Sequence, residues 1–172
     1  MVHPLPKALL SLILISAAPY PAQDDGASSL STAMLALHNH ERALVGVAPL
    51  AWSGRLAADA TAYAAHLVAI GDLEHSSDEA RGDEGENLAM GTAGYYSPTA
   101  LGEMWAQEKS DLVGGPFGDD SRTGSWEDIG HYTQMVWRGT RQVGCGVASG
   151  GGDTYLICRY APAGNYIGER VY

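Results

Sequence analysis

The chain has 172 residues, of which 45% are hydrophobic and 17% charged, so it is long enough and apolar enough to bury one globular core. Twenty acidic against ten basic side chains give a formal net charge of −10, which repels nucleic-acid phosphates and anionic membrane surfaces. These values argue against a disordered chain and against nucleic-acid binding. The acidic excess is compatible with cation binding, and equally with solubility alone.

The N-terminus has the pattern of a secretory signal. Lys7 precedes the apolar run Ala8–Ala18, which is too short to span a bilayer. Small residues place the cleavage between Ala18 and Ala22, so we predict a signal peptide over residues 1–22 and a short tether over 23–29. The mature protein is then extracellular, or periplasmic in a Gram-negative bacterium, with no further membrane segment. Residues 30–172 are predicted to form a single domain.

Two helices are predicted first along the chain. Apolar residues recur at helical spacing over residues 30–45, with Ser28 or Ser29 as the N-cap and Gly46 as the stop. The second helix begins after the N-cap Ser53 and ends at Gly71.

A third helix is predicted over residues 98–112, because Ser97-Pro98 combines a cap with a proline in the first turn. The polar segment Glu74–Gly85 and the glycine-rich segment 114–121 are predicted to be loops. Residues Asn165–Tyr172 are predicted to form an extended tail.

Two alternating runs near the C-terminus, Gln142–Ala148 and Thr154–Tyr160, are separated by glycines and predict a β-hairpin. Helices early and antiparallel strands late in the chain indicate the α+β class. A turn centred between Gly151 and Gly152 places Cys145 opposite Cys158, where paired Cα atoms lie about 4.5 Å apart, within reach of a disulfide. The alternative, two free thiols in a metal or redox site, is disfavoured by a spacing far from C-x-x-C.

Glu108 interrupts the apolar stripe of the third predicted helix, which runs through Leu101, Met104, Trp105 and Leu112. A carboxylate on a core-facing stripe needs a cation, a histidine or several donors, because unpaired burial costs several kcal/mol. The alternative is that the edge of the stripe meets solvent and Glu108 pairs with a lysine.

The histidines fall into two groups. His38, in the segment His38–Arg42, is interpreted as part of a hydrogen-bonded packing element, and His66 as a surface or structural residue. His75 and His131 lie in polar stretches outside the strong helical patterns, where binding sites are commonly found. Their spacing alone does not demonstrate a metal site.

Several motifs carry a family resemblance: Gly130-His131-Tyr132-Thr133-Gln134 through Trp137, Cys158-Arg159-Tyr160-Ala161-Pro162 through Tyr166, His38-Asn39-x-x-Arg42, and Gly85-Glu86-Asn87-Leu88. They resemble the CAP family, which comprises cysteine-rich secretory proteins, insect antigen 5 proteins and plant pathogenesis-related 1 proteins. The tail 164–172 is most similar to the plant members. The resemblance implies a three-layered α-β-α sandwich.

In this family two histidines and two glutamates line a central cleft, and by motif match they correspond to His75, Glu86, Glu108 and His131. Such a set suits Zn²⁺ or another divalent cation, with nitrogen and oxygen ligands and an open position for water. Plant members usually carry six cysteines, one of them just before the Gly-His motif. Here Ile129 occupies that position, and only Cys145 and Cys158 are present.

The resemblance implies a secreted module that binds a small lipid, a sterol or a protein partner. The alternative is a metal-dependent, peptidase-like hydrolase in which Glu86 or Glu108 activates a metal-bound water, with His131 assisting. No Gly-x-Ser-x-Gly motif is present, and oxyanion stabilisation is not readable from the sequence, so we favour binding. A structural domain with a decayed site is a third possibility.

Overall fold

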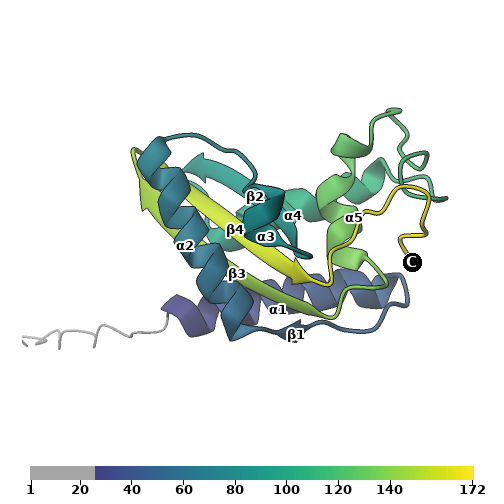
Figure 1. Cartoon of the computed structure of the whole chain (residues 1–172), viewed down its shortest axis with the longest axis horizontal. Helices are drawn as coiled ribbons and strands as arrows, with labels where there is room; N and C mark the ends of the chain where they lie inside the picture. Colours follow the sequence, from purple (N-terminus) through teal and green to yellow (C-terminus); the bar gives the residue numbers. More distant parts are fainter. Residues whose placement is uncertain (1–25) are drawn as a thin grey trace, which may run out of the picture.

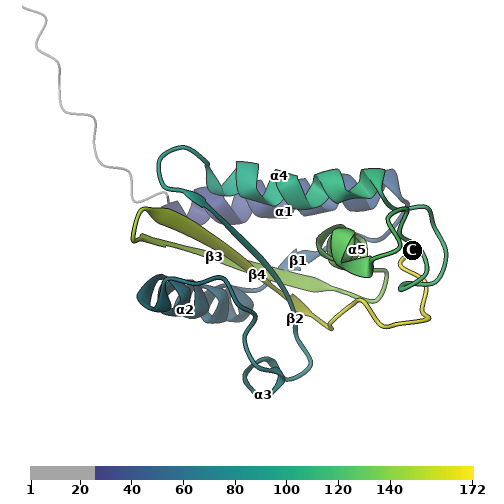
Figure 2. The ribbon, with the colours of Figure 1, turned by 90° about the horizontal axis from the view of Figure 1, so that it is seen from above.

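The computed structural model describes residues 26–172 and their side chains from Ser29 onward, so the predicted signal peptide lies outside the described residues. A sheet of four strands, in the order β1-β3-β4-β2, lies between two helical layers. Helices α1 (Gly26–Leu44) and α4 (Pro98–Gln107) cover one face, and α2 (Gly54–Ile70) covers the other (Figures 1 and 2). This arrangement confirms the predicted α+β class and the α-β-α sandwich. No helix within residues 26–172 is both long enough and apolar enough to cross a bilayer.

The predicted hairpin is present, formed by β3 (Gln142–Gly150) and β4 (Asp153–Ala161) around a two-glycine turn. Cys145 pairs with Cys158 in the register and is joined to it by a disulfide, with a Cα–Cα distance of 4.1 Å. The disulfide prediction is therefore confirmed.

Two further strands were not predicted. β1 (Ala51–Trp52) pairs in parallel with the start of β3, and β2 (Gly85–Thr92) pairs antiparallel with β4 along its whole length. β2 contains two glycines and a Glu-Asn pair and has no alternating β-branched residues, so strand propensity alone does not identify it. Pairing with the apolar strand β4 decides its conformation.

The helix predictions hold in their main features, with corrections at the ends. Ser53 caps α2, and Gly71 ends it in a left-handed conformation, as predicted. α1 begins at Gly26, four residues before the predicted start, so residues 26–29 of the predicted tether belong to this helix. α4 ends at Gln107 and continues as a 3₁₀ turn, η1 (Glu108–Ser110), instead of reaching residue 112.

Three short helices lie in segments without a strong helical pattern. α3 (Asp78–Arg81) is capped by Ser77 inside the predicted loop, and η2 (Trp126–Asp128) precedes α5 (Gly130–Val136). His131 therefore lies in the first turn of a helix, whereas the sequence placed it outside one. The segment is too short for an apolar period to be recognised.

Two apolar clusters hold the layers together. The larger lies between the sheet and the α1/α4 layer and includes Met34, Leu101, Trp105 and Met135. On the other face α2 packs so closely on β3 that a Cβ on Gly144 would lie 2.3 Å from the Ala57 backbone nitrogen. Only glycine fits there, which fixes how α2 lies across the sheet.

His38 belongs to a buried hydrogen-bonded element, as predicted. Its Nδ1 donates to the Met34 carbonyl at 2.7 Å, which leaves Nε2 to accept from the Tyr160 hydroxyl at 2.8 Å. Burial raises the pKa of Tyr160 well above its ordinary value, so the phenol keeps its proton. Burial also lowers the pKa of His38 from 6.5 to about 4. The hydrogen bond to Met34 acts in the opposite direction and raises this pKa, whereas the charge of Arg42 lowers it further.

We therefore expect acid to destabilise the fold through His38. The unfolded chain takes up a proton near pH 6.5 and the folded chain only near pH 4, so stability falls as pH falls across this interval. The loss amounts to about 3 kcal/mol at about 1.4 kcal/mol per pKa unit. Urea unfolding of wild type and His38→Gln at several pH values measures it, since the variant should show the weaker pH dependence. Parallel curves would contradict the assignment to His38.

Candidate functional site

Glu86, near the start of β2, holds His75 in place. The Glu86 side chain is almost fully buried, and its Oε1 lies 2.8 Å from the His75 Nδ1. The same carboxylate accepts hydrogen bonds from the Ser76 backbone N–H and from the Ser76 hydroxyl, both at 3.0 Å. The His75 side chain is 54% exposed, so a fixed acid orients an imidazole that reaches solvent.

Two arginines neutralise Glu86. The Arg159 Nε lies 2.9 Å from Oε2, a close ion pair although not a well-aligned hydrogen bond, and Arg81 approaches Oε1 at 3.4 Å. Burial by itself would raise the pKa of Glu86, but the hydrogen bond from His75, the charge of Arg159 and the bonds from Ser76 outweigh it. The pKa therefore lies below its ordinary value, and Glu86 is ionised at neutral pH.

Glu108, where α4 passes into η1, forms a second pair with His131. Its Oε1 lies 2.6 Å from the His131 Nδ1, and its Oε2 accepts from the backbone N–H groups of His131 and Tyr132 at 2.9 and 3.0 Å. These are first-turn donors of α5, where a negative charge is favoured. Glu108 is thus satisfied by a histidine and backbone donors, as the core-facing interpretation predicts. Its neighbour Lys109 pairs with Glu41 instead.

Trp105 supports the ring of His131 from the preceding turn of α4. The two rings stack with centroids 6.0 Å apart and an interplanar angle of 15°. The indole N–H donates to the Leu88 carbonyl of β2 at 3.1 Å, which holds the tryptophan in place. The orientation of His131 is therefore set by both Glu108 and Trp105.

The two His–Glu pairs flank β2, the strand at one edge of the sheet. Glu86 directs its side chain to the face that carries Arg159, whereas the next residue, Asn87, directs its side chain to the opposite face. The Asn87 amide donates to the His131 carbonyl at 3.0 Å and to the Tyr160 hydroxyl at 3.1 Å. One dipeptide of β2 thus contacts both pairs.

The structure does not gather all four side chains into one ligand set. A polar cleft of about 490 Å³ is lined by His75 and Glu86 together with Gln134, Gly164 and Asn165, but not by Glu108 or His131. Within residues 26–172, no three His, Cys, Asp or Glu side chains converge closely enough to hold a metal ion. Use of both pairs by one cation stays a prediction.

Asn87, Ser76, Arg159 and Asn165 shape the site and were given no role from the sequence. Asn165 has a positive φ of 60°, and its amide bonds both the Gly130 carbonyl and the Thr133 hydroxyl of α5, at 2.7 and 2.8 Å. Asn87, Arg159 and Asn165 lie inside the motifs that carry the family resemblance, and those motifs were the available signal. Ser76 and Arg159 contact the buried carboxylate of Glu86, and only the fold shows these contacts.

We expect Glu108→Gln to destabilise the protein by about 1–3 kcal/mol, because the amide cannot accept from three donors and lacks the charge that suits the start of α5. Urea unfolding measures the change, with Glu103→Gln as the control, since Glu103 is an exposed acid of α4, the helix that directly precedes Glu108. Equal losses in the two variants would mean that Glu108 does not hold α5.

Comparisons with known proteins all point to one family. Residues 35–160 match the model of the cysteine-rich secretory protein family, CAP. The chain is 42% identical over 137 residues to pathogenesis-related protein 1A of Nicotiana tabacum, covering 78% of this chain and 76% of that protein. It is also 42% identical over 142 residues to protein PRY2 of Saccharomyces cerevisiae, covering 81% of this chain but only 39% of PRY2.

Solved structures show the same fold. The crystal structure of NaASP2 with Zn²⁺ superposes with a TM-score of 0.72 at 26% identity, covering 87% of this chain and 88% of that one. The structure of BmVAL-1 superposes with a TM-score of 0.70 at 25% identity, covering 83% and 81%. With a matching family model over most of its length and close relatives among plant and yeast proteins, this chain belongs to the CAP family.

Proposed function

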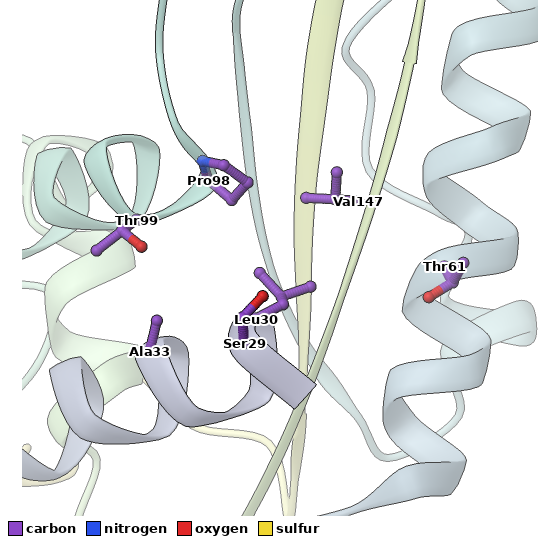
Figure 3. A pocket seen from close by; sticks show the side chains of 7 residues that line it. All are labelled: Ser29, Leu30, Ala33, Thr61, Pro98, Thr99 and Val147. Atoms are coloured by element: carbon purple, nitrogen blue, oxygen red, sulfur yellow. The ribbon is translucent and has the colours of Figure 1, made fainter. Parts of the chain in front are cut away.

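We propose that the protein is a secreted module that binds a small lipid or sterol, and that a divalent cation binds at its His–Glu pairs. The observation that carries the lipid proposal is an apolar cavity of about 620 Å³ between the N-terminal half of α1 and the start of α4 (Figure 3). Its lining residues are Ser29, Leu30, Ala33, Thr61, Pro98, Thr99 and Val147. None of them titrates, so the cavity suits an uncharged apolar group.

A second apolar cavity, of about 760 Å³, adjoins the first. It is lined by α2, Trp52 and Cys145, and it shares Leu30 and Thr61 with the first cavity. Sites for small molecules typically measure roughly 300–1,000 Å³ and are mostly apolar. The two cavities together therefore have room for a long acyl chain or a fused-ring skeleton.

Filling the first cavity should abolish lipid binding. We expect Ala33→Phe to weaken the binding of NBD-labelled stearate at least tenfold, since the added ring occupies space that the ligand needs. Ala36→Phe is the matched control, because Ala36 lies on the same helix and faces solvent. Fluorescence titration measures both variants, and mass spectrometry of an organic extract identifies copurified lipid. Equal affinity of both variants, with no lipid in the extract, would refute lipid binding here.

The chemistry of the His–Glu pairs supports the cation proposal. Each histidine uses Nδ1 for its glutamate, and within the described part of the chain neither Nε2 has a hydrogen-bond partner. A neutral imidazole that donates Nδ1–H to a carboxylate presents an unprotonated, more basic Nε2, the usual second-shell pattern of metal-binding histidines. The solved structure of NaASP2, of the same fold, contains Zn²⁺. We propose that His75 and His131 are the ligands, and that Glu86 and Glu108 orient them.

Replacing both histidines should abolish Zn²⁺ binding. We expect no calorimetric heat of binding with the His75→Ala/His131→Ala double variant, because both nitrogen ligands are gone. Glu108→Gln should weaken binding roughly 10–100-fold, the effect of losing a residue that orients a ligand. His66→Ala, at an exposed histidine of α2, serves as the control. Unchanged affinity in the double variant removes the metal assignment.

A metal-dependent hydrolase that uses the same pairs is the second candidate. A cation held by two imidazoles keeps open positions where a bound water can be activated. General-base catalysis, however, needs a carboxylate oxygen that is free to take a proton. Both oxygens of Glu86 and both of Glu108 already accept hydrogen bonds from the protein. Binding therefore ranks ahead of hydrolysis.

A further inference from the structure

Among residues 26–172, only a short strand pairs with the outer edge of β3. β1 pairs with Gln142 and Val143 and ends there. The Cα atoms of Cys145 and Cys158 lie 4.1 Å apart, the short distance of a non-hydrogen-bonded pair, so the backbone N–H and C=O of Cys145 point away from β4. The Val143 carbonyl points the same way, since it accepts from the Ser53 N–H at 2.9 Å. Because a strand repeats every two residues, the backbone N–H and C=O of Val147 also point away from β4.

Residues 26–172 supply no partner for these groups. After Trp52 it turns at Ser53 into α2, and the Ser53 carbonyl accepts from the Ala57 N–H inside that helix. Within residues 26–172, no backbone group bonds the outward N–H and C=O of Cys145 or Val147. The parallel pairing between β1 and β3 therefore ends before Cys145.

The two apolar cavities lie along this open edge. α1 and α2 cover opposite faces of the sheet (Figure 2), yet Leu30 of α1 and Thr61 of α2 line both cavities. A cavity that contacts helices on both faces of the sheet must extend around the edge of the sheet. Val147 lines the first cavity, where Figure 3 places it between Leu30 and Thr61, and Cys145 lines the second. The result is a groove with apolar walls and unpaired backbone groups along one side.

A pure hydrocarbon in this groove would leave the outward amide groups without partners, which costs free energy for each buried group. A carboxylate or phosphate would find no side-chain cation among the lining residues. A unit that offers one N–H and one C=O, spaced as in a peptide, can donate to the Cys145 carbonyl and accept from the Val147 N–H. This is the pattern by which β1 already pairs with β3.

We propose that the ligand is the amide of an N-acylated amino acid, with the aminoacyl unit paired to β3 at Cys145 and Val147 and the acyl chain in the apolar cavities. The proposal rests on the lipid-binding function proposed above and narrows it to one chemical class.

Three probes that carry the same acyl chain test the proposal: N-dodecanoylglycine methylamide, N-dodecanoylsarcosine methylamide and methyl dodecanoate. We expect the glycine probe to bind roughly tenfold tighter than either of the others, because it alone has both the N–H and the C=O of one aminoacyl residue. Competition against NBD-labelled stearate measures the three dissociation constants. Equal constants overturn the proposal while leaving lipid binding intact. Binding of none of the three overturns both.

Val147→Pro tests the position of the contact. Proline removes the outward N–H of Val147, which takes no part in the β3–β4 ladder, so the sheet keeps its bonds. We expect this variant to lose the preference for the glycine probe over methyl dodecanoate, so that the ratio of the two dissociation constants falls to about 1. Ser149→Pro, the same change at the next outward residue but outside both cavity linings, should keep the preference.

A measurement on wild type makes the test independent of how well the proline variant folds. The Val147 amide proton should move downfield in the NMR spectrum on addition of the glycine probe and not on addition of methyl dodecanoate. The same shift with both probes, or with neither, contradicts a hydrogen bond at Val147.

Discussion

The buried guanidinium of Arg42 is the contact on which the rest of the structure depends. It is fully enclosed and donates to four backbone carbonyls, those of Ala48, Met135, Trp137 and Thr140, at 2.7 to 3.0 Å. No carboxylate within residues 26–172 forms an ion pair with it. Burial, with the charge of Arg141, lowers its pKa to about 10, so it stays charged at neutral pH. Carbonyl dipoles thus take the place of a counterion.

This contact connects α1 to the segment that carries the site. Met135 and Trp137 lie at the C-terminal end of α5, where the unpaired carbonyls of a helix favour a cation. Thr140 lies shortly before the start of β3. Glu108 satisfies the opposite end of the same helix. A helix of only seven residues is therefore held at both ends by side chains from other elements, and His131 is positioned before any ligand arrives.

The proposed cation and lipid sites lie at opposite borders of the sheet. The His–Glu pairs flank β2, whereas the apolar groove follows the open edge of β3. A buried chain of hydrogen bonds joins the two regions, from the His131 carbonyl through Asn87, Tyr160 and His38 to the Met34 carbonyl of α1. Met34 adjoins Ala33, which lines the cavity. The frame contains one disulfide, Cys145–Cys158, and Ile129 is fully buried.

Local patterns in the sequence determined the α2 boundaries, the start of α4, the β3–β4 hairpin and its disulfide, because caps, glycine stops and alternation act over a few residues. The stripe position of Glu108 showed that this acid needs a partner, and motif resemblance named His131 as a candidate. Tertiary structure alone decided that Glu86 and Glu108 are held by backbone donors and arginines, that β2 is a strand, and that α5 is a helix. It also decided that β1 ends at Trp52, so that within residues 26–172 no strand pairs with the outer edge of β3 beyond Val143. Those outcomes depend on contacts between residues far apart in the chain, which no short-range pattern records.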